Sequence, residues 1–455
     1  MAAKRDSVNL TQGPIFKQII LFAIPLLLGQ LFQQLYNSVD SIVVGRFVGT
    51  TALAAVSSSG DISMLLTGFF VGFSSGASVV FGRAFGANRL DKLHDAIHTA
   101  LLFSVMIGVG IAALGIVCTP LLLRLVNCPA DVWVESDRYL RVYLVGVLFT
   151  SVYNVGAGVL RAVGDSRNPL IFLIISSITN ILLDLIFVAW LGLGVMGVAI
   201  ATVISQLLSV VLVIRKMLVT EDVYKLIPAD LKINKKLLKE ILSMGLPAAV
   251  QASLLSISNM IVQRNINGFG STVMAGAGVG KRIDRFCGLI PHCVGMALAV
   301  FASQNIGARN YARVYRSVRI CVLICTGFTV LLWIPTFLFT YEVSGIFTRD
   351  PDAIAVAVRM VRVMMPFYLF QGLFQVYSGV LRSFGRSRGV MILSLVGMIG
   401  IRQLYLAVAL ALDHRIEHVF LCFPVGWIAA ALLMIADYFI NVKRKYPAEA
   451  PSQAE

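Results

Sequence analysis

Four acidic residues lie within long apolar stretches of the sequence: Asp40, Asp61, Asp184 and Asp284. An ionisable residue is costly to bury in hydrocarbon, so each of them is a candidate functional residue. A carboxyl group in a site of low dielectric favours its protonated form, and can therefore bind and release a proton near neutral pH. For Asp40 the alternative is a structural hydrogen bond to a neighbouring helix.

Asp40 has polar neighbours on its own predicted helix face. Asn37 and Tyr36 lie three and four residues before it, which places both about one helical turn away. We therefore expect Tyr36 and Asn37 to support the Asp40 carboxyl group.

Asp184 has similar surroundings. Asn180 lies one turn before it, and Thr202 and Gln206 form a comparable pair on the next apolar stretch. Two carboxylates, an amide oxygen and a hydroxyl make a set of hard oxygen ligands. Asp40, Asn180, Asp184 and Thr202 could therefore hold Na⁺ or share a proton in a hydrogen-bonded network that Gln206 supports. The residues leave the choice of ion open.

The elements that position these residues are predicted to be membrane spans. Only 13% of the 455 residues are charged and 58% are hydrophobic, whereas a soluble domain carries about 25% charged residues. A helix of about 20 residues crosses a bilayer. We therefore predict an all-α polytopic membrane protein with 12 transmembrane helices. The predicted spans are 16–44, 52–81, 95–123, 138–160, 169–190, 195–217, 237–265, 275–304, 317–341, 356–381, 389–411 and 417–440.

The net charge of +15 is explained by orientation in the membrane. With the N-terminus inside, about two thirds of the Lys and Arg residues fall in cytoplasmic segments, as the positive-inside rule requires. We therefore expect a multi-pass protein of the plasma (inner) membrane with both termini in the cytoplasm. The lipid bilayer is its expected partner, and nucleic acid is not.

An internal repeat divides the chain into two halves. Residues 158–167 (GVLRAVGDSR) recur 221 residues later as 379–388 (GVLRSFGRSR). Each half has six predicted spans, so both enter the membrane in the same orientation. Two pseudo-symmetric six-helix bundles can enclose a central cleft that opens to either side, which suits alternating access. The predicted parts are a tail at 1–15, an N-lobe at 16–217, a linker at 218–236, a C-lobe at 237–441 and a tail at 442–455.

The sequence resembles the MATE (multidrug and toxic compound extrusion) family over about residues 13–442. The resemblance rests on the paired GVLRxxGxSR segments and on the runs 86–88 (GAN) and 304–308 (QNIGA). The runs 10–14 (LTQGP) and 35–40 (LYNSVD) look like the prokaryotic DinF-type branch.

The resemblance implies the MATE/MOP fold and secondary active efflux of organic cations or drugs by antiport with H⁺ or Na⁺. It implies that the protein is not an enzyme and uses no cofactor besides the coupling ion. It also places the coupling site at Asp40, Asn180, Asp184 and Thr202, in the N-lobe.

Pro25 lies inside the first predicted span, where it removes a helical hydrogen bond and favours a kink. The resemblance implies that Pro25 is a hinge, at which this span bends when the coupling site changes protonation. A static kink is the alternative, and Pro247 at the matching place in the second half supports it equally.

The remaining candidates could line the cleft. Asp61 could attract cations or pair with a basic residue. Asp284 lies between Arg282 and Arg285, where local neutralisation is the simpler interpretation. Arg402 lies within a span and could balance an acid or bind an anionic group of a substrate. Flexible, aromatic and amide side chains suit varied ligands, although ordinary helix packing also explains their presence. The candidates of this kind are Met260, Tyr368 and Gln371.

The alternative function is a lipid-linked sugar or lipid flippase of the same fold superfamily. The basic residues Arg282, Arg285 and Arg402 would suit a pyrophosphate group, whereas the acidic N-lobe set favours the exporter. The sequence contains no HExxH or P-loop motif, which argues against an enzyme. Two complete lobes make a monomer sufficient, so we expect a monomer.

Overall fold

The computed structural model describes residues 7–125 and 128–447. Within these residues, 12 helices are long and apolar enough to cross a membrane, which confirms the predicted number of spans. Several helices run beyond the predicted apolar stretches. For example, α2 (Thr50–Gly86) ends and α3 (Leu90–Leu125) begins in polar sequence that includes Arg83 and Lys92. Polar ends continue the helical hydrogen bonding but carry no hydropathy signal, so apolar runs underestimate helix length.

The first half contains α1 (Ile15–Phe47), α2, α3, α4 (Trp133–Ala162), α5 (Arg167–Asp184), the π-helical η1 (Leu185–Trp190) and α6 (Gly194–Val219). A short turn, η2 (Pro228–Asp230), interrupts the connection to the second half. The second half contains α7 (Lys235–Asn267), α8 (Ser271–Gly307), α9 (Tyr311–Gly345), α10 (Pro351–Met364), η3 (Met365–Phe367), α11 (Tyr368–Ser383), α12 (Ser387–Leu395), η4 (Val396–Ile401), α13 (Arg402–Leu412), α14 (Ile416–Asp437) and η5 (Tyr438–Lys443).

The chain forms two compact units. The N-terminal unit contains the residues up to Leu10 and Ile24–Ala249, and the C-terminal unit contains Thr11–Ala23 and the residues from Val250 onward. The helices α1 and α7 therefore contribute to both units. The predicted lobes, by contrast, divide the chain at the linker alone.

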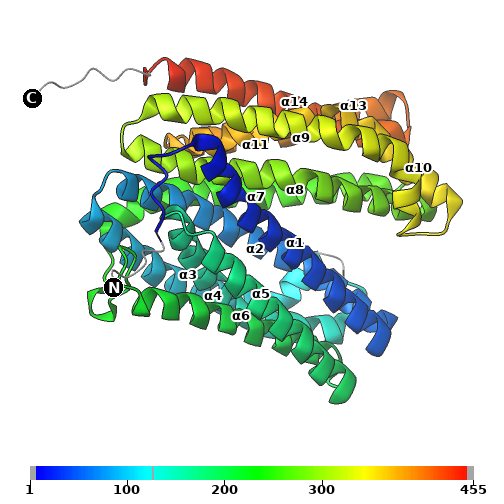
Figure 1. Cartoon of the computed structure of the whole chain (residues 1–455). Coiled ribbons are helices and arrows are strands. Elements are labelled where there is room, and N and C mark those ends of the chain that lie inside the picture. The colour runs from blue at the N-terminus through cyan, green and yellow to red at the C-terminus, as the bar shows by residue number, and fades with distance from the viewer. Residues whose placement is uncertain (1–6, 126–127, 448–455) are drawn as a thin grey trace, which may run out of the picture. The chain divides into compact units, whose positions relative to one another are not determined.

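The N-terminal unit is built around α4, which packs against α2, α3 and α6 (Figure 1). Gly158 of the repeated segment allows the close approach of α2, because an added Cβ atom would lie 2.5 Å from Ser74 Oγ. The core between these helices is apolar and includes Phe73, Phe81 and Leu160.

The C-terminal unit repeats this arrangement. Its α10 and α11, the counterparts of α4, each pack against α8, α9 and α14. Gly379, the repeat copy of Gly158, lies where α11 meets α8, and an added Cβ atom would lie 2.6 Å from Gly295 O. The repeated segment therefore marks the same tight helix crossing in both units.

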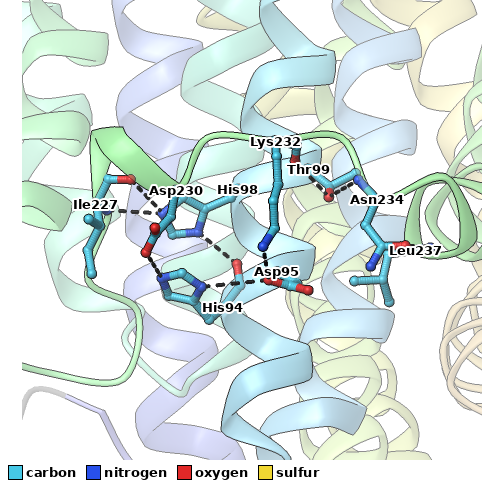
Figure 2. A network of polar contacts seen from close by, with 9 residues as sticks. All are labelled: His94, Asp95, His98, Thr99, Ile227, Asp230, Lys232, Asn234 and Leu237. Atoms are coloured by element: carbon cyan, nitrogen blue, oxygen red, sulfur yellow. Dashed lines mark hydrogen bonds and ion pairs between the residues drawn. The ribbon is translucent and has the colours of Figure 1, made fainter.

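The connection between α6 and α7 is fastened to the N-terminal unit by polar contacts (Figure 2). His98 of α3 is 1% exposed; its Nδ1 lies 2.8 Å from His94 O, and its Nε2 accepts from Ile227 N–H at 3.0 Å. Thr99 Oγ1 accepts from Asn234 N–H at 3.1 Å. Asp222 accepts two hydrogen bonds of 2.8 Å from Ser7. This linker is thus an ordered part of the N-terminal unit.

Candidate functional site

The carboxyl groups of Asp40 on α1 and Asp184 on α5 lie within hydrogen-bonding range of each other, inside the N-terminal unit. Asp184 is 0% exposed and is the last residue of α5, directly before η1. Neither Asp184 oxygen, nor Asp40 Oδ1, has a hydrogen-bond donor among the described residues. Two ionised carboxylates offer acceptors only. A proton or a cation between them would satisfy both.

The amide of Asn180 is buried one turn before Asp184, and both of its polar atoms are without a partner among the described residues. Thr202 is buried on α6, which packs against α5 and η1, and its hydroxyl donates to Val198 O at 2.9 Å. Gln206 Oε1 is buried on the same helix and is also unpartnered within the described part of the chain. These oxygens keep lone pairs free to accept a proton donor or to bind a hard cation.

Two phenol groups lie close to the carboxyl pair, and a third lies beside them. Tyr36 of α1 lies close to both carboxyl groups, as predicted for a residue one turn before Asp40. Tyr139 of α4 also lies close to both carboxyl groups, and Tyr143, one turn further, lies beside both tyrosines. Sequence reasoning did not select Tyr139 and Tyr143. Their spacing of one helical turn on a predicted span is the sequence feature that could have identified them.

Apolar side chains on the same helices pack beside this polar set. Val43, Val44 and Val188 belong to one buried cluster with residues of α4 and α6. Among the described side chains, no Lys or Arg forms an ion pair with either carboxyl group. Burying two like charges without a counter-ion costs several kcal/mol per ion. The site therefore demands a positive charge from outside the chain.

The charged candidates of the second half lie within the C-terminal unit. Asp284 Oδ1 accepts from the Tyr368 hydroxyl at 2.7 Å, and the charges of Arg285 and Lys281 lie nearby. Arg402 is 1% exposed and donates from Nη1 to Asn259 Oδ1 at 2.9 Å.

Three further candidates, Met260, Gln371 and Pro25, lie apart from these charged groups in the chain. Met260 is 41% exposed on α7, and Gln371 lies against Gly288 with its Oε1 buried. Pro25 lies within α1, which continues through it as one helix. The side chains of Asn37 and Asp61 lie outside the described part of the structure, although their helices are described.

Comparison with known proteins supplies the family. The MatE family model matches residues 25–186 and 247–406, one match in each half of the chain. The chain belongs to the MATE family. This is a family of transporters, so the expectation that the protein is not an enzyme is confirmed.

Two relatives and one solved structure illustrate how far the similarity extends. The probable multidrug resistance protein YoeA of Bacillus subtilis is 30% identical over 95% of both chains. The multidrug export protein MepA of Staphylococcus aureus is 23% identical over 88% of both. A multidrug resistance MATE family transporter of the MOP superfamily, solved in an outward-facing conformation, superposes with a TM-score of 0.88 at 23% identity, covering 94% of this chain and 96% of its own. The predicted MATE/MOP fold is therefore confirmed.

The two matched segments of this MATE transporter correspond to its internal repeat, yet the carboxyl pair occurs once. The repeat positions of Asn180 and Asp184 are Ile401 and Tyr405. The symmetric fold alone therefore does not require the polar set.

Proposed function

We propose that this MATE protein is a secondary active multidrug exporter, which moves organic cations or drugs out of the cell in exchange for H⁺ or Na⁺. Relatives named for multidrug resistance and export support this proposal. The observation that carries the antiport mechanism is the buried carboxyl pair of Asp40 and Asp184, which has no basic partner among the described residues.

The pair suits ion coupling because its charge must be offset before the site can stay buried. The buried oxygens of Asp40 and Asp184 have no donor within the described residues, and Asn180 adds a further free amide oxygen. A proton shared by the carboxyl groups, or Na⁺ held by these oxygens with Thr202, would offset the charge. Ion entry from outside would then neutralise the site.

Transport follows as alternating access. The outward-open protein takes up the ion at Asp40 and Asp184. The resulting rearrangement of α1 lowers the affinity of the protein for the organic cation, which then leaves to the outside. The ion is then released inward, and a new substrate binds from the cytoplasm. A ligand shifts a conformational equilibrium only by its differential affinity for the two states. The buried pair provides that difference, since only its neutralised form is stable without water.

Three finer assignments belong to the same proposal. The LYNSVD run and the N-terminal coupling set support the DinF-type branch. The distribution of Lys and Arg supports a plasma-membrane location with both termini in the cytoplasm. The two repeated halves support a monomer as the transporting form.

The test is transport by purified protein in proteoliposomes that contain a trapped pH dye. A lipophilic organic cation is added with and without a Na⁺ gradient, and wild type is compared with Asp40→Asn. Asp137→Asn is the matched control, because that carboxylate pairs with Arg141 at 2.8 Å, outside the buried site. We expect coupled flux in wild type and in the control, and loss of coupling in Asp40→Asn.

The dependence on ions then identifies the partner of the exchange. Proton flux that ignores Na⁺ would assign H⁺, and cation uptake that requires Na⁺ and leaves the pH unchanged would assign Na⁺. Normal coupled export by Asp40→Asn would refute the site. No response of wild type to several cations under either gradient would refute the exporter and favour the flippase alternative.

A further inference from the structure

Arg402 carries a positive charge into the interior of the C-terminal unit. Its side chain is 1% exposed, and it is the first residue of α13, directly after the π-helical turn η4. Single π-helical turns within α-helices occur frequently at functional sites.

The guanidinium group of Arg402 meets neutral groups. Nη1 donates to Asn259 Oδ1 at 2.9 Å, Nη2 donates to Ser258 Oγ, and the centroid of the Phe423 ring lies 5.5 Å from Cζ. Nε is buried with no acceptor among the described residues. In the same part of the structure, no carboxylate forms an ion pair with Arg402. The group therefore keeps both its charge and unused donors.

The carboxylate of this region is already engaged. Asp284 accepts a hydrogen bond from Tyr368 at 2.7 Å, and it lies beside Lys281 and Arg285. Lys281 also lies near enough to Arg402 for their positive charges to interact. Arg402 thus adds a positive charge to a buried region in which the acid already has two basic neighbours.

An uncompensated charge in a protein interior is costly, and the cost falls when a counter-ion binds. Guanidinium groups bind carboxylate and phosphate through charge-assisted, often paired, hydrogen bonds. We propose that Arg402, positioned by Ser258 and Asn259, binds the anionic group (carboxylate, sulfonate or phosphate) of a small organic ligand within the C-terminal unit. Phe423 provides an apolar surface beside that group. This site is separate from Asp40 and Asp184 and does not depend on ion-coupled export.

The test is a binding measurement with three probes of one shape and different charge. These are 2-naphthoate, 2-naphthamide and 2-naphthamidine, titrated by calorimetry into the full chain in nanodiscs of neutral lipid. A charge-assisted contact predicts that naphthoate binds at least about tenfold more tightly than either of the other probes. Equal binding of the three, or a preference for the amidine, would overturn the proposal.

Two substitutions locate the site. Arg402→Gln removes the charge and should abolish the preference for naphthoate. Asn259→Asp keeps Arg402 and the local shape, but places a carboxylate where Asn259 Oδ1 now lies, 2.9 Å from Nη1. We expect this internal counter-ion to weaken naphthoate binding by at least about tenfold and to raise the melting temperature. Wild-type naphthoate affinity in Asn259→Asp would refute the site even if Arg402→Gln fails to fold.

The control is Arg359→Gln, because Arg359 is an exposed residue paired with Glu417 at 2.8 Å. It should bind naphthoate as wild type does, and loss of binding in this variant would show that the preference arises from general surface charge. A second arm uses nanodiscs that contain phosphatidylglycerol. If naphthoate binds more weakly in these nanodiscs, and the lipid has no such effect on Arg402→Gln, a lipid phosphate competes for the same anion site. Unchanged naphthoate binding would identify a free ligand as the occupant. No ion gradient is present, so this result is independent of the exporter proposal.

Discussion

The carboxyl group of Asp40 on α1 approaches that of Asp184 on α5 within hydrogen-bonding range, although 144 residues separate them in the chain. Their ionisation is therefore coupled, and protons or cations bind to the pair and not to either residue alone. The ion-coupling proposal thus makes a specific claim about how mutations at these two positions combine.

The first prediction is that Asp40→Asn and Asp184→Asn are not additive. Either substitution should reduce cation-driven coupled flux by at least about tenfold, because the remaining carboxyl group has lost the partner with which it shares the ion. The double variant should then be little worse than either single variant. Initial flux rates in proteoliposomes measure all three variants against wild type.

Thermal melting of the purified variants is the control for this cycle, because an isosteric amide should keep the fold. If the logarithmic effects of the two substitutions simply add, the carboxyl groups act independently, and the shared-site interpretation is incorrect.

The second prediction concerns the tight helix crossing of the C-terminal unit. Gly379→Ala should lower stability by about 2 kcal/mol, because backbone atoms cannot move aside for the new methyl group as a side chain could. The added Cβ would lie 2.6 Å from the carbonyl oxygen of Gly295. Gly327→Ala is the matched control, since no atom of the described residues lies within 4 Å of its added Cβ. Denaturant or thermal unfolding of both variants in detergent tests this, and equal stability would contradict the observed packing.

Much of this architecture can be predicted from sequence because hydrocarbon imposes a simple rule. A helix must be apolar over about 20 residues to cross the bilayer, so the number of spans follows directly. The ends of the helices cannot be predicted in this way, because polar residues such as Lys92 also belong to a helix but carry no hydropathy signal. The division into units at α1 and α7 depends on contacts distant in sequence.

The candidate site, too, can be predicted from sequence only in part. The residue types of Asp40 and Asp184 identify them, since a carboxylate in an apolar stretch is exceptional. Tyr139 is an ordinary residue for a span, and only tertiary packing brings it to the carboxyl pair. Arg402 could be selected by charge, whereas its neutral partners Ser258 and Asn259 become visible only when α7 and α13 are packed.

The third prediction concerns the attachment of the linker to α3. His98→Ala should speed trypsin cleavage after Lys225 and Lys232, because the buried imidazole bonds the backbone at Ile227 (Figure 2). Removing it breaks the hydrogen bond to the Ile227 backbone, which contributes about 0.5–1.5 kcal/mol. His94→Ala is the control, since among the described residues the His94 side chain reaches the linker through the longer contact with Asp230, at 3.5 Å. Equal cleavage rates in the two variants would show that His98 does not hold the linker.

The last prediction separates a hinge at Pro25 from a static feature. Pro25 and Pro247 lie within three residues of the points at which α1 and α7 pass from one compact unit to the other. Each proline removes a backbone donor, so each locally weakens its helix. Because α1 also carries Asp40, bending at Pro25 would link the charge of the pair to the path of the helix. Pro25→Ala should therefore slow coupled export by about tenfold without lowering the melting temperature, while equilibrium binding of the coupling ion persists.

Pro247→Ala is the matched control, because α7 carries neither member of the carboxyl pair. It should affect export less than Pro25→Ala. Equal slowing by both substitutions would indicate that the two prolines serve the symmetric motion of the halves. Unchanged export in Pro25→Ala would mean that Pro25 is a static feature of α1, and ion binding would then have to act on transport by another route.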